Sequence, residues 1–168
     1  DVMLSSGTRV FILDIGGSYA PLAKLLGGEI IEFGALSSFT INPFSGLKRD
    51  MPDNEFNQLV VCSKELLSIM CGAQGEFEAA SLEKAIKDAV IENNYTLDLQ
   101  IFVKFLQASD SDLLKQFATS LFSYTPSGVF GKYFSGEKPA NFDKSTTIFE
   151  FEHVKDQPKL IAIILQTL

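Results

Sequence analysis

The stretch that most restricts the fold is VFILDIGGSYAPLAKLLGGEIIEFG, residues 10–34. It opens with an apolar run that ends at Asp14, too short for a buried helix but suited to a parallel strand covered on both faces. A glycine pair then predicts a turn, a proline suits the first turn of a helix, and a second glycine pair ends that helix. A short second strand follows. This order predicts an α/β domain in which the first strand is central.

After residue 53 the hydrophobic period changes to steps of three and four, which is typical of amphipathic helices. Four such helices in succession predict a helical insertion over residues 53–124. We expect the third to be capped by Thr96 or a neighbour, and the fourth by Ser111 or Asp110. Phenylalanines at helical spacing are expected in the core, namely Phe102, Phe105, Phe117 and Phe122.

The last part of the chain returns to mixed structure. A glycine-spaced loop precedes STTIFEFEHV, whose alternation and β-branched content predict a strand. A helix is expected to begin near Pro158. We therefore expect a single domain over residues 1–168, organised as strand–helix–strand (9–34), helical insertion (53–124), and glycine loop, strand and C-terminal helix (125–168).

Charge and cysteine content exclude several classes of function. A net charge of −7 argues against direct nucleic-acid binding, which depends on clustered Lys and Arg. Cys62 and Cys71 form neither a disulfide framework nor a metal-ligand spacing, so we expect buried thiols. The start of the sequence lacks the basic and apolar regions of a signal peptide, and no apolar run reaches the length of a membrane span, so we expect a cytoplasmic location. Because it begins without Met and in mid-pattern, we expect a piece of a longer protein.

Three groups of residues are candidates for a chemical site. Asp14 ends its strand as a Mg²⁺-approaching acid would, although turn chemistry explains it equally. Glu150 and Glu152 are expected on one face of the last strand, either as a polar face at a sheet edge or, with Asp14, around a metal. His153, the only histidine, lacks a hydrolase signature and is expected to be partly exposed at a strand end.

The glycine loop GVFGKYFSG does not match a phosphate-binding loop. That motif needs four residues between its glycines and a hydroxyl residue after the lysine, whereas two residues intervene here and Tyr133 follows Lys132. We expect the glycines to let the backbone turn while Phe130, Tyr133 and Phe134 pack or contact a neighbour.

Several segments together resemble one family. VFILDIGGSYAPLAKLLGGEIIEFG, INPF, YTPSGVFGKYFSG and TTIFEFEHVKDQPKLIAIILQTL are similar, in this order, to the central part of the TraC-type ATPases of conjugation and type IV secretion. The resemblance implies a partial RecA-like P-loop NTPase sheet with a mostly helical insertion. It also implies that the phosphate loop precedes this sequence and that the acidic Mg²⁺-and-water strand follows it. One departure is Gly17, where the family pattern has a basic residue.

The resemblance implies a function for the parent protein and weak site candidates here. The parent would use ATP and Mg²⁺ to energise DNA or protein translocation and pilus assembly, while the isolated chain, with no cofactor of its own, would be inactive. Asp14, Ser18 and Tyr19 would approach the nucleotide region, as would Glu150 and Glu152. Candidates for partner contact are Asn42, Phe44, Phe130, Lys132, Tyr133 and Phe134.

The expected partners are other subunits, commonly six in a ring, and secretion-channel proteins, through which the parent would associate with the cytoplasmic face of the inner membrane. Two alternatives stay open. The chain is a self-contained protein-interaction module, or it is a small metal-dependent enzyme that uses Asp14, Glu150 and Glu152.

Overall fold

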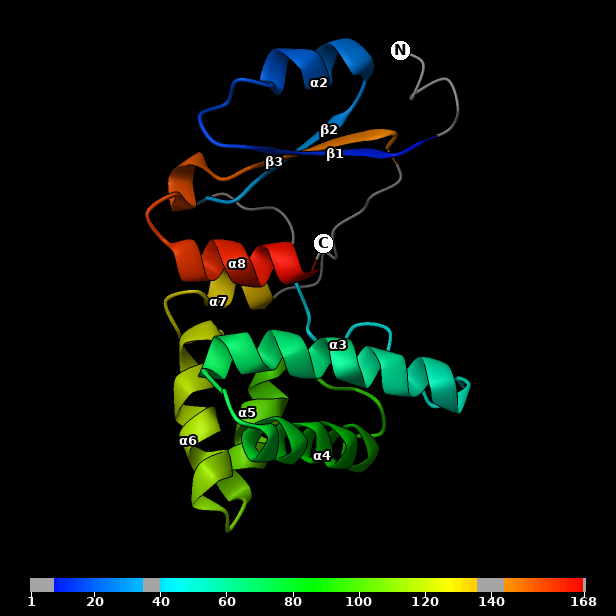
Figure 1. Cartoon of the computed structure of the whole chain (residues 1–168), viewed down its shortest axis with the longest axis vertical. Helices are drawn as coiled ribbons and strands as arrows, with labels where there is room; N and C mark the ends of the chain where they lie inside the picture. The colour runs from blue at the N-terminus through cyan, green and yellow to red at the C-terminus, as the bar shows by residue number, and fades with distance from the viewer. Residues whose placement is uncertain (1–7, 35–39, 136–143, 168) are drawn as a thin grey trace. The chain divides into compact units, whose positions relative to one another are not determined.

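Two units make up the computed structural model, which describes residues 8–34, 40–135 and 144–167 (Figure 1). The sheet unit takes residues 1–40 and 136–165, and the helical unit takes residues 41–135 and the last three residues. The helical unit is therefore an insertion between two halves of the sheet unit. The segment 125–168 is divided between the two units.

A three-stranded parallel sheet organises the sheet unit. Its strands are β1 (Val10–Asp14), β2 (Glu29–Glu32) and β3 (Thr146–Glu150), in the spatial order β1-β3-β2. Parallel strands of one sheet cannot be joined by a tight turn and need a crossover. Helix α2 (Ala20–Leu26) lies in the crossover from β1 to β2, which flank β3, and the whole helical unit is inserted between β2 and β3. The α/β class expected from the sequence is confirmed.

The predicted order of the strands is corrected. Among the described strands, the central one is β3, whose five residues are all buried, and β1 lies at one side of the sheet. Phe11 and Leu13, which share one face of β1, are 51% and 55% exposed. The prediction of a central first strand covered on both faces is therefore wrong. A continuous apolar run does not distinguish a strand buried on two faces from one with an uncovered apolar face.

Helices α2 and α8 lie on opposite sides of the sheet (Figure 1). Helix α2 has Pro21 in its first turn and ends at Gly27, which adopts the left-handed conformation (φ 64°), as the sequence predicted. Gly28 passes so close to β3 that an added Cβ would lie 2.7 Å from the carbonyl oxygen of Thr146. Helix α8 (Pro158–Thr167) begins at the expected proline and buries Leu160, Ile163 and Ile164.

The helical unit consists of four long helices and two short ones. They are α3 (Asp53–Cys71), α4 (Glu76–Glu92), α5 (Leu99–Ala108), α6 (Asp112–Leu121), the 3-10 turn η1 (Phe122–Tyr124) and α7 (Gly131–Phe134). The four predicted helices are confirmed. Asp98 caps α5 by accepting a hydrogen bond from the Ile101 amide (2.7 Å), and Ser111 caps α6 as expected.

Two of the four phenylalanines expected in the core of this unit are confirmed there. Phe102 and Phe117 are buried, Phe105 is only half-buried, and Phe122 follows α6 into the 3-10 turn and is 51% exposed. Cys62 is exposed and Cys71 is half-buried, so the expectation of buried thiols is wrong for Cys62. Within residues 8–34, 40–135 and 144–167, no helix is long and apolar enough to cross a bilayer.

Candidate functional site

Three carboxylates line up where the parallel strands end. The strand register places Glu150 of β3 directly between Asp14 of β1 and Glu32 of β2. Asp14 and Glu150 are buried, at 5% and 7% exposure, whereas Glu32 is exposed. Like charges side by side on one sheet face repel each other, so the buried pair requires compensating hydrogen bonds.

The central carboxylate is held by backbone amides. Oε1 of Glu150 accepts hydrogen bonds from the Gly16 amide at 3.1 Å and from the Glu152 amide at 2.8 Å. Gly16 follows β1 and Glu152 follows β3. A single carboxylate oxygen therefore links the backbone that follows β1 to the backbone that follows β3.

Asp14 organises the turn that leads into α2. Its Oδ2 accepts a hydrogen bond from the Tyr19 amide at 2.9 Å. Between these residues, Gly16 (φ 106°) and Gly17 (φ 71°) occupy backbone conformations that other residues adopt only with strain. This hydrogen bond supports a role for Asp14 in the turn, and its approach to a ligand stays a prediction.

A small hollow of about 240 Å³ opens at this carboxyl end of the sheet. Its wall includes Gly16, Gly17, Glu32, Glu150, Glu152 and His153. His153 is exposed, as expected, and its ring packs over Gly34, where an added Cβ would lie 2.9 Å from Cδ2. The hollow is strongly acidic, which favours cationic or hydroxyl-bearing groups over free anions.

Glu152 does not share a strand face with Glu150. Strand β3 ends at Glu150, and Glu152 begins the 3-10 turn η2 (Glu152–Val154). The prediction of a shared strand face, and that of a sheet-edge strand, are therefore wrong. Glu152 instead pairs with Lys155 at 2.6 Å, and this hydrogen bond, together with the negative charge of Glu152, raises the pKa of the Lys155 ammonium.

The acids do not form a metal site. Among the residues that the structure describes, no group of three or more His, Cys, Asp or Glu side chains is placed to hold a metal ion. Asp14 and Glu150 each direct an oxygen at backbone N–H groups rather than toward a common point. The geometry thus gives no support to the alternative of a metal-dependent enzyme.

Residues of the INPF segment stabilise the helical unit internally. The Asn42 amide nitrogen donates to the Leu97 carbonyl at 3.1 Å, and Asn42 Oδ1 accepts from the Phe44 amide at 3.0 Å. The Phe44 ring is 3% exposed and lies 5.1 Å from the ring of Phe102. Asn42 is exposed, so of these two partner-contact candidates only Asn42 presents surface.

The glycine loop is a tightly folded aromatic cluster. Tyr124 stacks on Phe130 and meets Phe134 edge-on, with ring centroids 5.4 Å apart in both pairs. Tyr133 and Phe134 are each 3% exposed, whereas Lys132 is exposed and lies over the Tyr133 ring. The aromatic residues pack internally, which was one of the two roles expected for them.

Close backbone approach explains two glycines of this loop, and the third, Gly136, lies outside the described residues. A Cβ on Gly128 would lie 2.3 Å from the Ser123 carbonyl oxygen, and one on Gly131 would lie 2.2 Å from that of Thr125. A Cβ at either position would overlap backbone atoms unless the loop shifted. The spacing that superficially suggested a phosphate loop is therefore a packing requirement.

Two features escaped the sequence reasoning. Glu32 completes the row of carboxylates, and the sequence pattern that could have revealed it is that each of the three predicted strands carries an acid near its end.

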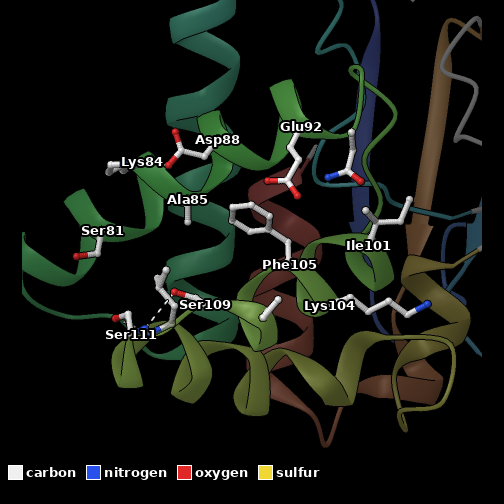
Figure 2. A pocket seen from close by; sticks show the side chains of 13 residues that line it. Ser81, Lys84, Ala85, Asp88, Glu92, Ile101, Lys104, Phe105, Ser109 and Ser111 are labelled. Carbon is white, nitrogen blue, oxygen red and sulfur yellow. Dashed lines mark hydrogen bonds and ion pairs between the residues drawn. The ribbon is translucent and has the colours of Figure 1, made fainter.

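The second feature is a larger hollow of about 840 Å³ in the helical unit, between α4, α5 and α6 (Figure 2). Its lining comes from three helices that are separated in sequence, so no local motif announces it.

Comparison with solved structures identifies the fold. VirB4 of Thermoanaerobacter pseudethanolicus aligns with 99% of this chain and with 68% of its own, at a TM-score of 0.74 and 15% sequence identity. The fold is that of VirB4. No protein-family model matches the chain, and no curated protein matches it. The VirB4 alignment includes both the sheet unit and the helical insertion, because almost nothing of this chain lies outside it.

Proposed function

We propose that this chain is part of a type IV secretion ATPase and forms the segment between its two nucleotide-binding motifs. The observation that carries the proposal is the VirB4 fold over 99% of the chain. The order of the INPF, glycine-loop and strand motifs supports the same family independently of the structure. The finer assignment to a TraC-type protein of conjugative transfer rests on those motifs.

The residues present do not fit a nucleotide triphosphate by themselves. The hollow at the carboxyl end of the sheet is lined by Glu32, Glu150 and Glu152, whose charges repel phosphate. It has no lysine in its wall, and the chain contains no G-x-x-x-x-G-K-[ST] motif. ATP and Mg²⁺ would therefore be held by elements of the parent that this sequence does not contain.

The proposed role of the chain is to shape one wall of the nucleotide region. Ligands of open α/β sheets bind outside the carboxyl ends of the strands, which is where Asp14 and Glu150 fix the Gly16–Tyr19 turn. The uncovered apolar face of β1 supports further coverage by the parent, since Phe11 and Leu13 are more than half exposed. Contacts with other ATPase subunits, with a six-membered ring as the expected assembly, and with secretion-channel proteins at the inner membrane belong to the same proposal.

The test compares ATP turnover by the 168-residue chain and by the full-length polypeptide that contains it. We expect Mg²⁺-dependent hydrolysis by the full-length protein and none by the chain alone. Reading the open reading frame on both sides should reveal a phosphate loop upstream and a strand ending in adjacent acids downstream. Turnover by the isolated chain, or natural termini at both ends, would refute the proposal and favour a self-contained interaction module.

A further inference from the structure

Glu150 carries a buried charge that the described residues compensate only in part. The residue is 7% exposed, and both of its hydrogen bonds, from the Gly16 and Glu152 amides, reach the same oxygen, Oε1. The other oxygen, Oε2, has no hydrogen-bond or ion-pair partner in the part of the chain that the structure describes. Buried carboxylates are normally paired with a cation or fully hydrogen-bonded, so Oε2 is an acceptor without a donor.

The neighbours of Glu150 add charge of the same sign. Asp14 and Glu32 flank it in the strand register, and buried Asp14 accepts its hydrogen bond from a neutral backbone amide. Lys155 lies close by but pairs with Glu152. None of the ion pairs among residues 8–34, 40–135 and 144–167 involves the three strand-end acids. This end of the sheet is therefore a row of carboxylates without a counter-ion from the described residues.

The acceptor without a donor borders the hollow at the carboxyl end of the sheet. A Cβ on Gly17 would lie 3.7 Å from Oε2 of Glu150, and one on Gly16 would lie 3.9 Å from Oε2 of Glu152. Because both turn positions are glycine, neither contributes a side chain that could cover these oxygens. All four residues line the hollow, whose volume is about 240 Å³. This is below the roughly 300–1,000 Å³ of sites for drug-sized ligands and suits a single charged head group.

We propose that this hollow binds a guanidinium group, with Oε2 of Glu150 as the principal acceptor and the carboxylates of Glu32 and Glu152 beside it. A metal ion needs several ligand atoms that converge on one point, and the described acids offer no such group. A guanidinium carries five N–H donors around a plane, so it can serve carboxylates that approach it from different sides. It is also more weakly hydrated than an ammonium, which lowers the cost of entering a partly buried hollow.

The guanidinium comes from outside this chain. The sequence contains two arginines, and Arg9 precedes β1, at the opposite end of that strand from Asp14. The other, Arg49, donates to Asn94 in the helical unit. The source is therefore an arginine side chain of another polypeptide segment or a small guanidino compound. The inference rests on the sheet unit alone and is independent of the proposed ATPase function.

NMR titration of the isotopically labelled 168-residue chain with methylguanidinium chloride tests this inference. We expect saturable shifts of the Gly16, Gly17 and Glu152 amide signals. Equal concentrations of sodium chloride and tetramethylammonium chloride are the controls, because neither cation donates a hydrogen bond. Glu150→Gln should weaken binding about tenfold, since it removes the charge of the principal acceptor. Glu29→Gln removes a charge at the other end of β2, outside the hollow, and should leave binding unchanged.

Two further probes separate the sources of the guanidinium. N-acetylarginine methylamide represents a polypeptide side chain and agmatine a free guanidino compound, so the tighter of the two identifies the source and supports the proposal. Thermal unfolding of each variant distinguishes loss of fold from loss of binding, and Glu32→Gln, which alters an exposed wall residue, should also weaken binding, to a lesser degree.

Several results would overturn the proposal. They are the absence of shifts with all three guanidinium probes, equal shifts with tetramethylammonium, and binding that Glu150→Gln in its folded state leaves unchanged. Saturation by magnesium chloride at lower concentrations than by methylguanidinium would also overturn it, because the hollow would then be a metal site.

Discussion

Replacing Glu150 should separate its role as a hydrogen-bond acceptor from its charge. Glu150→Leu removes the oxygen that accepts the amides of Gly16 and Glu152. Hydrogen bonds to charged groups contribute about 1.5–3 kcal/mol each. The exposed Gly16 amide can rehydrate, that of half-buried Glu152 does so less completely, and loss of the charge also relieves repulsion from Asp14 and Glu32. We therefore expect the free energy of unfolding to fall by about 2–3 kcal/mol, less than the sum of the two hydrogen bonds.

Glu150→Gln should behave differently. The amide oxygen keeps an acceptor at the same place, and loss of the charge relieves repulsion from Asp14 and Glu32, at about 0.2–1 kcal/mol for each neighbour. This relief offsets the weaker hydrogen bonds. We expect the free energy of unfolding of the Gln variant to lie within about 1 kcal/mol of that of the unsubstituted chain.

Thermal and urea unfolding followed by circular dichroism would measure both changes. For a chain of this length, 1 kcal/mol corresponds to about 2–4 °C in Tm, so the Leu variant should melt about 4–12 °C lower. Glu32→Gln is the control, because Glu32 is exposed at the same end of the sheet and should cost no more than about 0.5 kcal/mol. A Leu variant as stable as the unsubstituted chain would refute the reasoning that Glu150 stabilises the sheet by linking the segments that follow β1 and β3.

Three further predictions concern other positions. Gly131→Ala should destabilise the chain by about 2 kcal/mol in urea unfolding, because about 3 kcal/mol of overlap with the Thr125 carbonyl is partly offset by the gain in helix propensity. Gly75→Ala is the control, since its Cβ meets no backbone atom, and it should cost less than about 1 kcal/mol. Equal effects of the two substitutions would contradict this reasoning. Burial, and secondarily a nearby thiol, raises the pKa of the Tyr124 phenol above its ordinary value of 10.0. The folded state therefore binds this proton more tightly than the unfolded state, and the free energy of unfolding falls as pH rises above about 10. Tyr124→Phe should flatten that decline between about pH 9 and 11, and an unchanged slope would contradict the assignment to Tyr124. Gly17→Lys should cost about 1–2 kcal/mol because φ at this position is +71°, although the nearest atom to its Cβ, an oxygen of the Glu150 carboxylate, lies at an ordinary 3.7 Å. Gly17→Asn should cost less. A Lys variant that is more stable in thermal unfolding would show that ion pairing outweighs backbone strain.

Local signals predicted the elements of the fold well. The Pro21–Gly27 helix, the four helices of the insertion and the Ser111 cap each depend on residues within one or two turns of one another. Such signals act through backbone conformation and local hydrogen bonds, and a single sequence displays them. The family resemblance supplied the fold class that the comparison with VirB4 then supported.

The sequence predicted the arrangement of the elements less well than the elements themselves. Whether β1 is flanked on one side or two is decided by pairing with β3, more than 130 residues away in the sequence. The role of Glu150 as an acceptor for two amides likewise depends on which strand exits come together. The glycines at 128 and 131 were assigned to turning, but their reason is contact with carbonyl groups of residues 123 and 125, which only the folded loop reveals.

The position of β3 in the sequence has a consequence for biosynthesis. On the ribosome, β1 and β2 emerge more than a hundred residues before the strand that must lie between them, and during that interval neither has its native hydrogen-bonding partner. The contiguous stretch 41–135 is complete by then and can acquire its own tertiary structure first. We therefore expect assembly to follow translation, in that the inserted helices can fold first and these three strands pair only when β3 arrives. Nascent chains stalled before residue 144 should accordingly present two unpaired strands to chaperones.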